Sequence, residues 1–226
     1  MSDSPRVGSV VALAGASGLV GSRCLEALLA HTGVEGVVSV GRRHVPTAHP
    51  KLTQVEVDFA ALGPDTASPR PVQAAICALG TTLAKAGSRD AFRAVDHDAV
   101  LAFARWAKAQ GASTFVLVSS VGANPNARSF YLKVKGQVEA ALADMGWQRL
   151  VALHPGLLLG KREESRPGEA VARAMMPLLN PLLRGPLTRF RGVSAEVVAS
   201  AAVRACRADS PGIFVWEHAE LVGPVA

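Results

Sequence analysis

The segment from Val7 to Ala30 has the sequence VGSVVALAGASGLVGSRCLEALLA, and it decides the fold. Its first part, Val7–Ala14, is apolar and rich in valine, which predicts a buried β-strand. Its last part, Ser22–Ala30, has apolar residues at helical spacing and predicts an α-helix. The turn between them, Gly15–Gly21, has the glycine spacing GxxGxxG. A strand, a glycine-rich turn and a helix in this order are typical of a unit that binds a dinucleotide.

Each glycine of this turn has a distinct physical task. Gly15 permits the tight turn after the strand, Gly18 lets backbone N–H groups approach a pyrophosphate, and Gly21 lets the helix lie close to the strand. The N-terminus of the helix adds unpaired donors and a partial positive charge. A tight connection without a ligand is the alternative, but the strand–turn–helix setting favours a phosphate site.

The same alternation of strand and helix continues along the chain. Short apolar runs are followed by longer alanine-rich segments of helical period, which predicts repeated β–α units and a parallel sheet. Further strands are expected at Gly36–Val40, Leu52–Val57, Gln73–Ala78, Thr114–Val118, Leu150–Leu153 and Ile213–Trp216. Further helices are expected at Phe92–Gln110, from a cap at Ser129 to about Met145, at Ala170–Met176 and at Val193–Arg207, with a loop at Arg162–Gly168.

We therefore predict an α/β fold: a Rossmann-type, doubly wound parallel sheet with helices on both faces and small substrate-side elements near the C-terminus. At 226 residues the chain can bury one substantial core. We expect a single NAD(P)-binding domain over residues 1–226, in which the C-terminal third, about residues 155–226, contributes the substrate-side elements.

Composition excludes several other classes of protein. Apolar residues make up 49% of the chain and charged residues 19%, which argues against a disordered protein. The net charge is +6, but the basic residues are scattered, so we expect no nucleic-acid partner. The three cysteines are isolated, and no metal spacing is present, so no metal site is expected. Neither a secretory signal nor an apolar run of about 20 residues is found, so we expect no membrane contact and a cytoplasmic location.

Residues after the second and third strands bear on the choice of dinucleotide. Folds that prefer NAD carry an acidic residue about 20 residues beyond the glycines, but here the second strand ends in Arg42-Arg43. Two guanidinium groups can hold a 2′-phosphate through charge-assisted hydrogen bonds, so we expect NADP(H) rather than NAD. Asp58, after the third strand, either accepts a hydrogen bond from adenine or caps a turn. Leu79-Gly80 ends the fourth strand, where glycine lets the backbone pass close to a cofactor.

Catalytic candidates follow the fifth strand and lie on the next helix. Tyr131 and Lys135 form a YxxxK pattern, and residues four apart share one helix face. A phenol is a weak acid near neutrality, and a neighbouring ammonium favours its ionised form. Ser119 and Ser120 follow the fifth strand at the carboxyl edge of the sheet, and we favour Ser120 as the hydroxyl that polarises a substrate carbonyl. Tyr131 is the only tyrosine in the chain.

With these motifs the chain resembles an atypical short-chain dehydrogenase/reductase, and more narrowly the family of the human Tat-interacting tumour-suppressor oxidoreductase and its bacterial relatives. The resemblance spans roughly residues 10–170 and fades beyond them. It is carried by the glycine turn, by Val40-Gly41-Arg42-Arg43, Leu79-Gly80-Thr81-Thr82, Tyr131-Leu132-Lys133-Val134-Lys135-Gly136 and Glu164-Ser165-Arg166-Pro167-Gly168-Glu169.

The resemblance also implies a cofactor site and a catalytic role. Tyr131 would be the proton donor and acceptor. The implied NADPH contacts are Ser17, Gly18, Leu19, Val20, Arg42, Arg43, Leu79, Gly80, Tyr131 and Lys135, with further contacts at Leu158 and Arg166.

The expected activity is therefore an NADPH-dependent carbonyl reductase with a Ser-Tyr-Lys mechanism and a small carbonyl substrate. One alternative is a regulatory or redox-sensing protein that binds NADPH and a protein partner with little or no turnover. Another is a nucleotide-sugar epimerase, which uses the same Tyr–Lys pair with a permanently bound NAD; Arg42-Arg43 and the short chain disfavour it.

Overall fold

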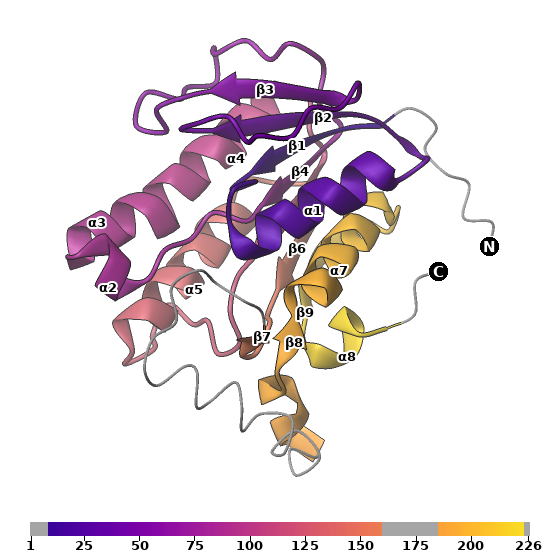
Figure 1. Cartoon of the computed structure of the whole chain (residues 1–226). Helices are drawn as coiled ribbons and strands as arrows, with labels where there is room; N and C mark the ends of the chain where they lie inside the picture. Colours follow the sequence, from indigo (N-terminus) through magenta and orange to yellow (C-terminus); the bar gives the residue numbers. More distant parts are fainter. Residues whose placement is uncertain (1–8, 160–184, 224–226) are drawn as a thin grey trace.

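The computed structural model describes residues 9–159 and 185–223, and its centre is a sheet of parallel strands (Figure 1). The order across the sheet is β3-β2-β1-β4-β5-β6-β9, and every neighbouring pair is parallel. The strands are β1 (Ser9–Ala14), β2 (Val34–Gly41), β3 (Leu52–Glu56), β4 (Ala74–Cys77), β5 (Thr114–Val118), β6 (Arg149–Leu153) and β9 (Gly212–Trp216). This order confirms the predicted Rossmann-type fold.

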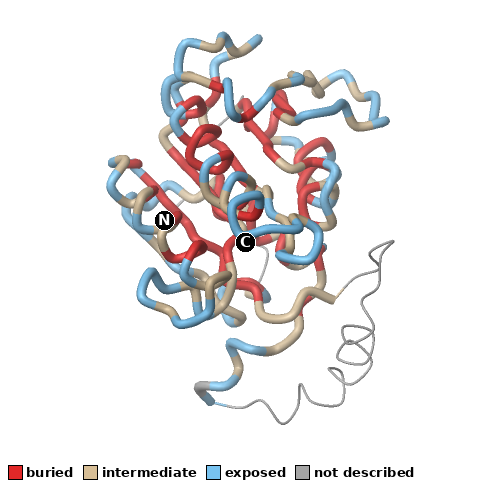
Figure 2. Tube along the Cα trace, turned by 90° about the vertical axis from the view of Figure 1, so that its left-hand side faces the viewer, coloured by how far each residue is buried: buried red, intermediate tan, exposed pale blue. Residues whose placement is uncertain are grey.

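Helices cover both faces of the sheet, because successive strand residues point to opposite sides. The odd-numbered pair Val11 and Leu13 of β1 packs with α1 (Leu19–Ala30) and α7 (Ala195–Arg207). The alternate pair Val10 and Ala12 packs in the second core with α4 (Ala99–Ala109) and α5 (Phe130–Ala143). The buried residues, red in Figure 2, accordingly run through the strands and the helix faces turned toward them.

The chain reverses direction across the sheet between β1 and β4. Strands β2 and β3 lie on one side of β1, and β4, β5, β6 and β9 lie on the other. In open parallel sheets, a crevice that binds ligands forms at this reversal, beyond the carboxyl ends of the strands. The segments that follow β1, β4 and β5 therefore meet at one edge.

Several element boundaries differ from the predicted ones. Helix α1 begins at Leu19 instead of Ser22, because Gly18 is already its N-cap residue. The expected helix from Phe92 to Gln110 begins earlier, as α3 (Arg89–Arg93), and passes through a π-helical turn, Ala94–Asp98, before α4. Ser129 occupies the N-cap position of α5, but its side chain makes no capping hydrogen bond, so its expected capping role is wrong.

Smaller elements complete the described part of the chain. Two short helices were not expected, α2 (Leu83–Ala86) and α8 (His218–Leu221). Strands β7 (Leu158–Leu159) and β8 (Val193–Ser194) pair with each other, and a 3-10 helix spans Gly185–Phe190. The predicted start of the first strand at Val7, the loop at Arg162–Gly168 and the helix at Ala170–Met176 include residues outside the described ranges.

A buried arginine attaches the last strand to the rest of the sheet. Arg149 on β6 is 4% exposed, and its Nε donates to the carbonyl oxygen of Ala205 on α7 over 3.1 Å. Its guanidinium also lies 4.4 Å from the ring centroid of Phe214 on β9. One side chain of β6 therefore contacts both α7 and β9 at this end of the sheet.

Candidate functional site

The glycine turn after β1 has no room for side chains at its first and third glycines. Gly15 has a φ of +88°, and a Cβ built on it would lie 2.6 Å from the carbonyl group of Ala78. A Cβ on Gly21 would lie 1.9 Å from the carbonyl oxygen of Gly15. The turn and the start of α1 are therefore packed backbone against backbone, as the GxxGxxG spacing predicts.

The N-terminus of α1 offers backbone donors at this edge. Its N-cap residue is Gly18, no side chain of the described residues caps it, and no acidic residue stands in the first turn. Ser17 and Gly18 are exposed, and Leu19 is partly exposed. The first N–H groups of a helix lack intrahelical partners and carry a partial positive charge. The site therefore fits a pyrophosphate.

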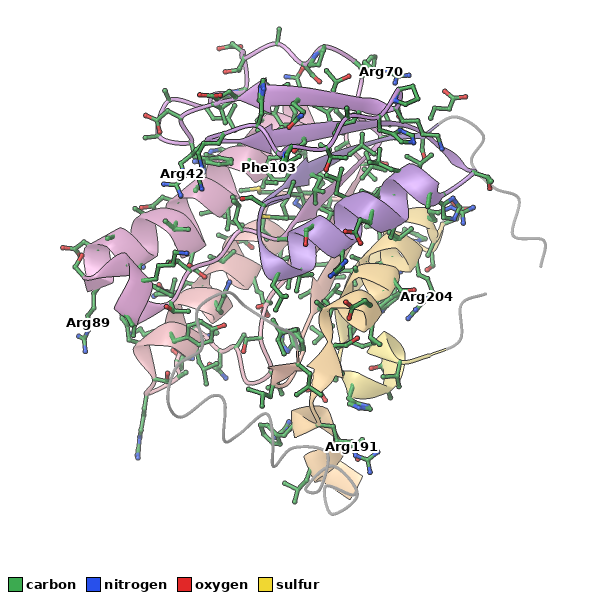
Figure 3. The ribbon with its side chains drawn as sticks, viewed as in Figure 1. Arg42, Arg70, Arg89, Phe103, Arg191 and Arg204 are labelled. Carbon is green, nitrogen blue, oxygen red and sulfur yellow. The ribbon has the colours of Figure 1, made fainter. Side chains whose placement is uncertain are left out.

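Two arginines follow β2 and extend into solvent. Arg42 and Arg43 are both exposed, and Figure 3 shows Arg42 at the carboxyl end of β2. Within the described residues, neither guanidinium has an ion-pair partner. Two positive charges at this edge of the sheet are available to an anion.

Asp58 caps a turn after β3. Its Oδ1 accepts a hydrogen bond from the backbone N–H of Ala60 at 3.0 Å, and its carbonyl oxygen accepts one from Ala61. This geometry is the turn cap expected as one of two alternatives. The contact of Asp58 with adenine stays a prediction.

The YxxxK pair lies on the first two turns of α5. Lys135 is 4% exposed, whereas Tyr131 is partly exposed. The ring of Phe92 packs at 5.8 Å, centroid to centroid, against the ring of Tyr131. The tyrosine therefore has a fixed apolar neighbour and a surface open to a substrate.

Lys135 is held by a carboxylate that the sequence motifs did not point to. Its Nζ lies 2.9 Å from Oδ1 of Asp96, which is 1% exposed and belongs to the π-helical turn. The other oxygen of Asp96 accepts a hydrogen bond from the backbone N–H of Thr81 at 2.7 Å. Burial lowers the pKa of Lys135, but the charges of Asp96 and Tyr131 outweigh burial and raise it above the usual value. Lys135 is therefore an ammonium at neutral pH.

The loop after β4 lies directly over this ion pair. Gly80 is exposed, and a Cβ on it would lie 3.4 Å from Oδ1 of Asp96 and 3.8 Å from Nζ of Lys135. Leu79 is partly buried against the core between the sheet and α4. The loop thus offers bare backbone at the edge where Tyr131 lies.

The two serines after β5 have different surroundings. Ser119 is buried, and its hydroxyl donates to Oε1 of Glu139 on α5. The same oxygen lies 2.8 Å from Nε2 of His154, a buried residue after β6. Ser120 is partly exposed, and within the described part of the chain its hydroxyl makes only a long hydrogen bond of 3.4 Å to the carbonyl oxygen of its neighbour Val121. Ser119 therefore serves a buried network, and Ser120 has the hydroxyl that can turn toward a substrate.

The last two expected cofactor contacts fall in the C-terminal third. Leu158 lies on β7 and is partly buried. Arg166 lies outside the described residues. Val20 is buried in the core on the α1 side of the sheet, and its expected contact with the cofactor stays a prediction.

Sequence reasoning missed Asp96, Glu139 and the buried contact of His154. A signal for Asp96 was present: an acidic residue lies four residues after Phe92 and four before Val100, on the face that is buried. Glu139 follows Lys135 by four residues, so it had to share the face of the YxxxK pair. In the described part of the chain, no group of three His, Cys, Asp or Glu side chains is placed to hold a metal ion.

Comparison with known sequences finds similar proteins in fungi and mammals. The chain is 37% identical over 201 residues to "Protein fmp52, mitochondrial" of Emericella nidulans, covering 86% of each chain. It is 35% identical over 216 residues to "Protein FMP52-1, mitochondrial" of Scheffersomyces stipitis, covering 92% of this chain and 94% of that one. Rat "Protein HTATIP2" is 40% identical over 166 residues, which are 72% of this chain and 68% of the rat protein. No family model matches the chain.

Solved structures with the same fold are more distant in sequence. A UDP-N-acetylglucosamine 4-epimerase from Methanobrevibacter ruminantium superposes with a TM-score of 0.69 at 18% identity, covering 93% of this chain and 77% of the epimerase. The enzyme WbmH from Bordetella bronchiseptica, in complex with NAD⁺, has a TM-score of 0.69 at 21% identity, covering 93% of this chain and 76% of WbmH.

These relatives contradict the expected cytoplasmic location, because the fungal proteins are named as mitochondrial. The expectation rested on the lack of a secretory signal and of a long apolar run, and these two features do not distinguish the cytoplasm from other compartments. Among the described helices, none has the length and apolar character that a membrane span requires.

Proposed function

The chain belongs to the family of atypical short-chain dehydrogenases/reductases that includes HTATIP2 and the fungal Fmp52 proteins, and on this premise we propose that it is an NADPH-dependent carbonyl reductase. The observation that carries the proposal is the buried ammonium of Lys135 on the same face of α5 as Tyr131, under the exposed backbone of Gly80. Such a reaction needs a proton donor, a fixed cation and an exposed backbone segment at the carboxyl edge of a parallel sheet. Tyr131, Lys135 and Gly80 supply these three groups.

NADPH fits the residues at this edge. The uncapped N-terminus of α1 would bind the pyrophosphate, and Arg42 and Arg43 would bind the 2′-phosphate. Gly80 would lie against the nicotinamide half, with Lys135 donating to the adjacent ribose. When bound, the cofactor supplies a hydride to the substrate carbon. NAD⁺ bound to WbmH, which has the same fold, supports a nicotinamide cofactor in general.

The chain's own residues supply the rest of the reaction. Ser120 donates a hydrogen bond to the carbonyl oxygen and stabilises the negative charge that develops there. Tyr131 donates its proton to that oxygen, which yields the alcohol. Lys135 stabilises the phenolate that remains until a proton from solvent restores the phenol. Phe92 fixes the tyrosine ring beside the site.

Binding and turnover test this proposal separately. Titration of the purified protein should show tight binding of NADPH and weak binding of NADH, and a panel of aldehydes and ketones should contain a compound that consumes NADPH. Tyr131→Phe should lower the turnover by about 100-fold or more, since general acid catalysis contributes roughly 10² to 10⁴, while NADPH binding stays near wild type.

Two results would overturn the proposal. Without measurable affinity for NADPH the cofactor assignment fails, and full turnover in Tyr131→Phe rules out the proposed acid. Tight NADPH binding without turnover across the panel favours the alternative of a regulatory protein that binds NADPH.

A further inference from the structure

Helices α1 and α7 lie side by side on one face of the sheet, and a groove runs between them (Figure 1). Its volume is about 430 Å³, which is within the usual range of small-molecule sites. Small side chains line its middle, among them Ala27 on α1 and Ala199 on α7. The proposed reaction assigns no task to this part of the molecule.

The two ends of the groove differ, because the two helices run in the same direction. At their N-terminal ends, Arg23 on α1 pairs with Glu26 at 2.8 Å and with Glu196 on α7 at 3.1 Å. At their C-terminal ends, Nη1 of Arg207 lies 2.8 Å from Nε2 of His31. Arg23 and His31 are separated by eight residues, a distance of about 12 Å along a helix. The groove therefore offers the length of a small molecule between two polar ends.

The C-terminal end of the groove is positively charged. Arg204 and Arg207 lie in the last turn of α7. Nearby, Nζ of Lys51 donates to the carbonyl oxygen of His31 at 2.9 Å. Within the described residues, none of these three cations has an ion-pair partner. The pKa of His31 responds to this field: burial lowers it, and the charges of Arg207 and Lys51 lower it further.

Two N–H groups face the ring of His31, although a neutral imidazole has only one acceptor nitrogen. The backbone N–H of Gly33 donates to Nδ1 at 3.0 Å, and Nη1 of Arg207 faces Nε2. One of these two donors therefore meets another N–H group instead of an acceptor. An oxygen atom of a ligand in the groove would give the guanidinium of Arg207 the acceptor that the ring does not supply.

A second guanidinium borders the same end. One Nη of Arg204 donates to the carbonyl oxygens of Glu220 at 2.6 Å and Leu221 at 3.2 Å, which fixes this side chain beside α8. Figure 3 shows Arg204 projecting from α7. A guanidinium has five N–H donors, so others remain for a ligand. Ser200, one helical turn before Arg204, adds a hydroxyl to the lining of the groove.

We propose that the groove between α1 and α7 binds a small organic anion, whose phosphate or carboxylate group contacts Arg204 and Arg207 and whose apolar part covers Ala27 and Ala199. Guanidinium groups bind both kinds of anion through paired hydrogen bonds. The carboxylates at the N-terminal end orient the ligand, because they repel its charged group. The site lies at the opposite end of α1 from the proposed pyrophosphate donors, so it is distinct from the cofactor site.

Titration calorimetry with three probes tests this inference: glycerol 3-phosphate, succinate and uncharged glycerol. The wild-type protein should bind at least one of the two anions saturably and should not bind glycerol, and the comparison of the anions shows which charged group the site prefers. Excess NADPH should not displace the bound anion. Arg204→Gln combined with Arg207→Gln should weaken anion binding about 10-fold or more, since hydrogen bonds from charged groups contribute about this much.

Arg105→Gln is the matched control. Arg105 is an exposed arginine on α4, which packs on the other face of the sheet, so its loss should leave anion binding unchanged. Ser200→Leu covers the case in which the double arginine variant does not fold. It keeps every charge but fills the middle of the groove, so it should also weaken binding of the anion.

Four results would overturn the inference: no saturable binding of either anion, displacement of the anion by NADPH, equal losses in Arg105→Gln and the arginine double variant, or wild-type affinity in the groove variants. The test does not depend on the proposed function. A protein without affinity for NADPH would refute the reductase, and the groove variants would still locate the bound anion. Turnover of a carbonyl without anion binding would refute only the groove site.

Discussion

Gly21→Ala gives a sharp test of the glycine turn, because the structure provides the size of the clash. The added Cβ would lie 1.9 Å from the carbonyl oxygen of Gly15, whereas ordinary contact begins at 3.4 Å. The turn or the helix must therefore move by about 1.5 Å, the difference between these distances. That carbonyl also accepts the N–H of Gly18 at 2.9 Å, so the movement would disturb the hydrogen bond that closes the turn.

Two opposing free-energy terms decide the outcome. Forcing an extra methyl group into a packed site costs about 1–3 kcal/mol, and the upper end applies because the obstacle is backbone. Replacing glycine by alanine within a helix gains about 1 kcal/mol. The net destabilisation should be about 2 kcal/mol, which lowers the Tm of a chain of this length by roughly 4–8 °C.

The assay combines thermal unfolding with NADPH titration. Gly21→Ala should lower the Tm and also weaken NADPH binding, since the displaced N–H groups are the proposed pyrophosphate donors. Gly63→Ala is the matched control, because a Cβ at Gly63 would meet nothing within 4 Å. Wild-type stability together with wild-type affinity in Gly21→Ala would refute the packing argument.

Three further predictions follow from the arginines, the ion pair and the thiols. Arg42→Ala combined with Arg43→Ala should weaken NADPH binding about 10- to 100-fold and leave NADH binding unchanged. The reason is that charge-assisted hydrogen bonds of this kind contribute roughly 1.5–3 kcal/mol. Equal losses of affinity for both cofactors in a binding titration would contradict the 2′-phosphate contact. Lys135→Met should lower the free energy of unfolding, measured by urea denaturation, by about 3–5 kcal/mol, because it leaves Asp96 buried without its ion-pair partner. Adding Asp96→Asn should restore part of this loss. No recovery of stability in the double variant would argue against the ion pair. Burial raises the pKa of Cys24 and of Cys77 from 9.0 to about 12, so their folded-state pKa values lie above the unfolded value. The contribution of these thiols to stability is present below pH 9 and decreases as the pH rises above it. Urea unfolding between pH 8 and pH 10 should detect this decrease. A constant free energy of unfolding in this range, or fast alkylation of the native thiols at pH 8, would contradict their burial.

The sequence alone determined the sheet and the glycine turn, because these depend on local patterns. Apolar runs of strand length, alternating with alanine-rich segments, identified the strands of the seven-stranded sheet to within a few residues, whereas the short strands β7 and β8 were missed and Val193–Ser194 was predicted to be helical. The spacing of Gly15, Gly18 and Gly21 predicted backbone packing that side chains would prevent. The placement of Tyr131 and Lys135 four residues apart on one helix followed from helical periodicity.

Only the tertiary structure decided what surrounds the reactive groups. Asp96 reaches Lys135 from a segment almost 40 residues earlier in the chain, and Glu139 joins Ser119 to His154 across three elements. Local patterns encode which residues share a strand or a helix face, but charges and hydrogen bonds act through space between elements that packing brings together. The charge balance at the proposed active site is therefore a property of the fold.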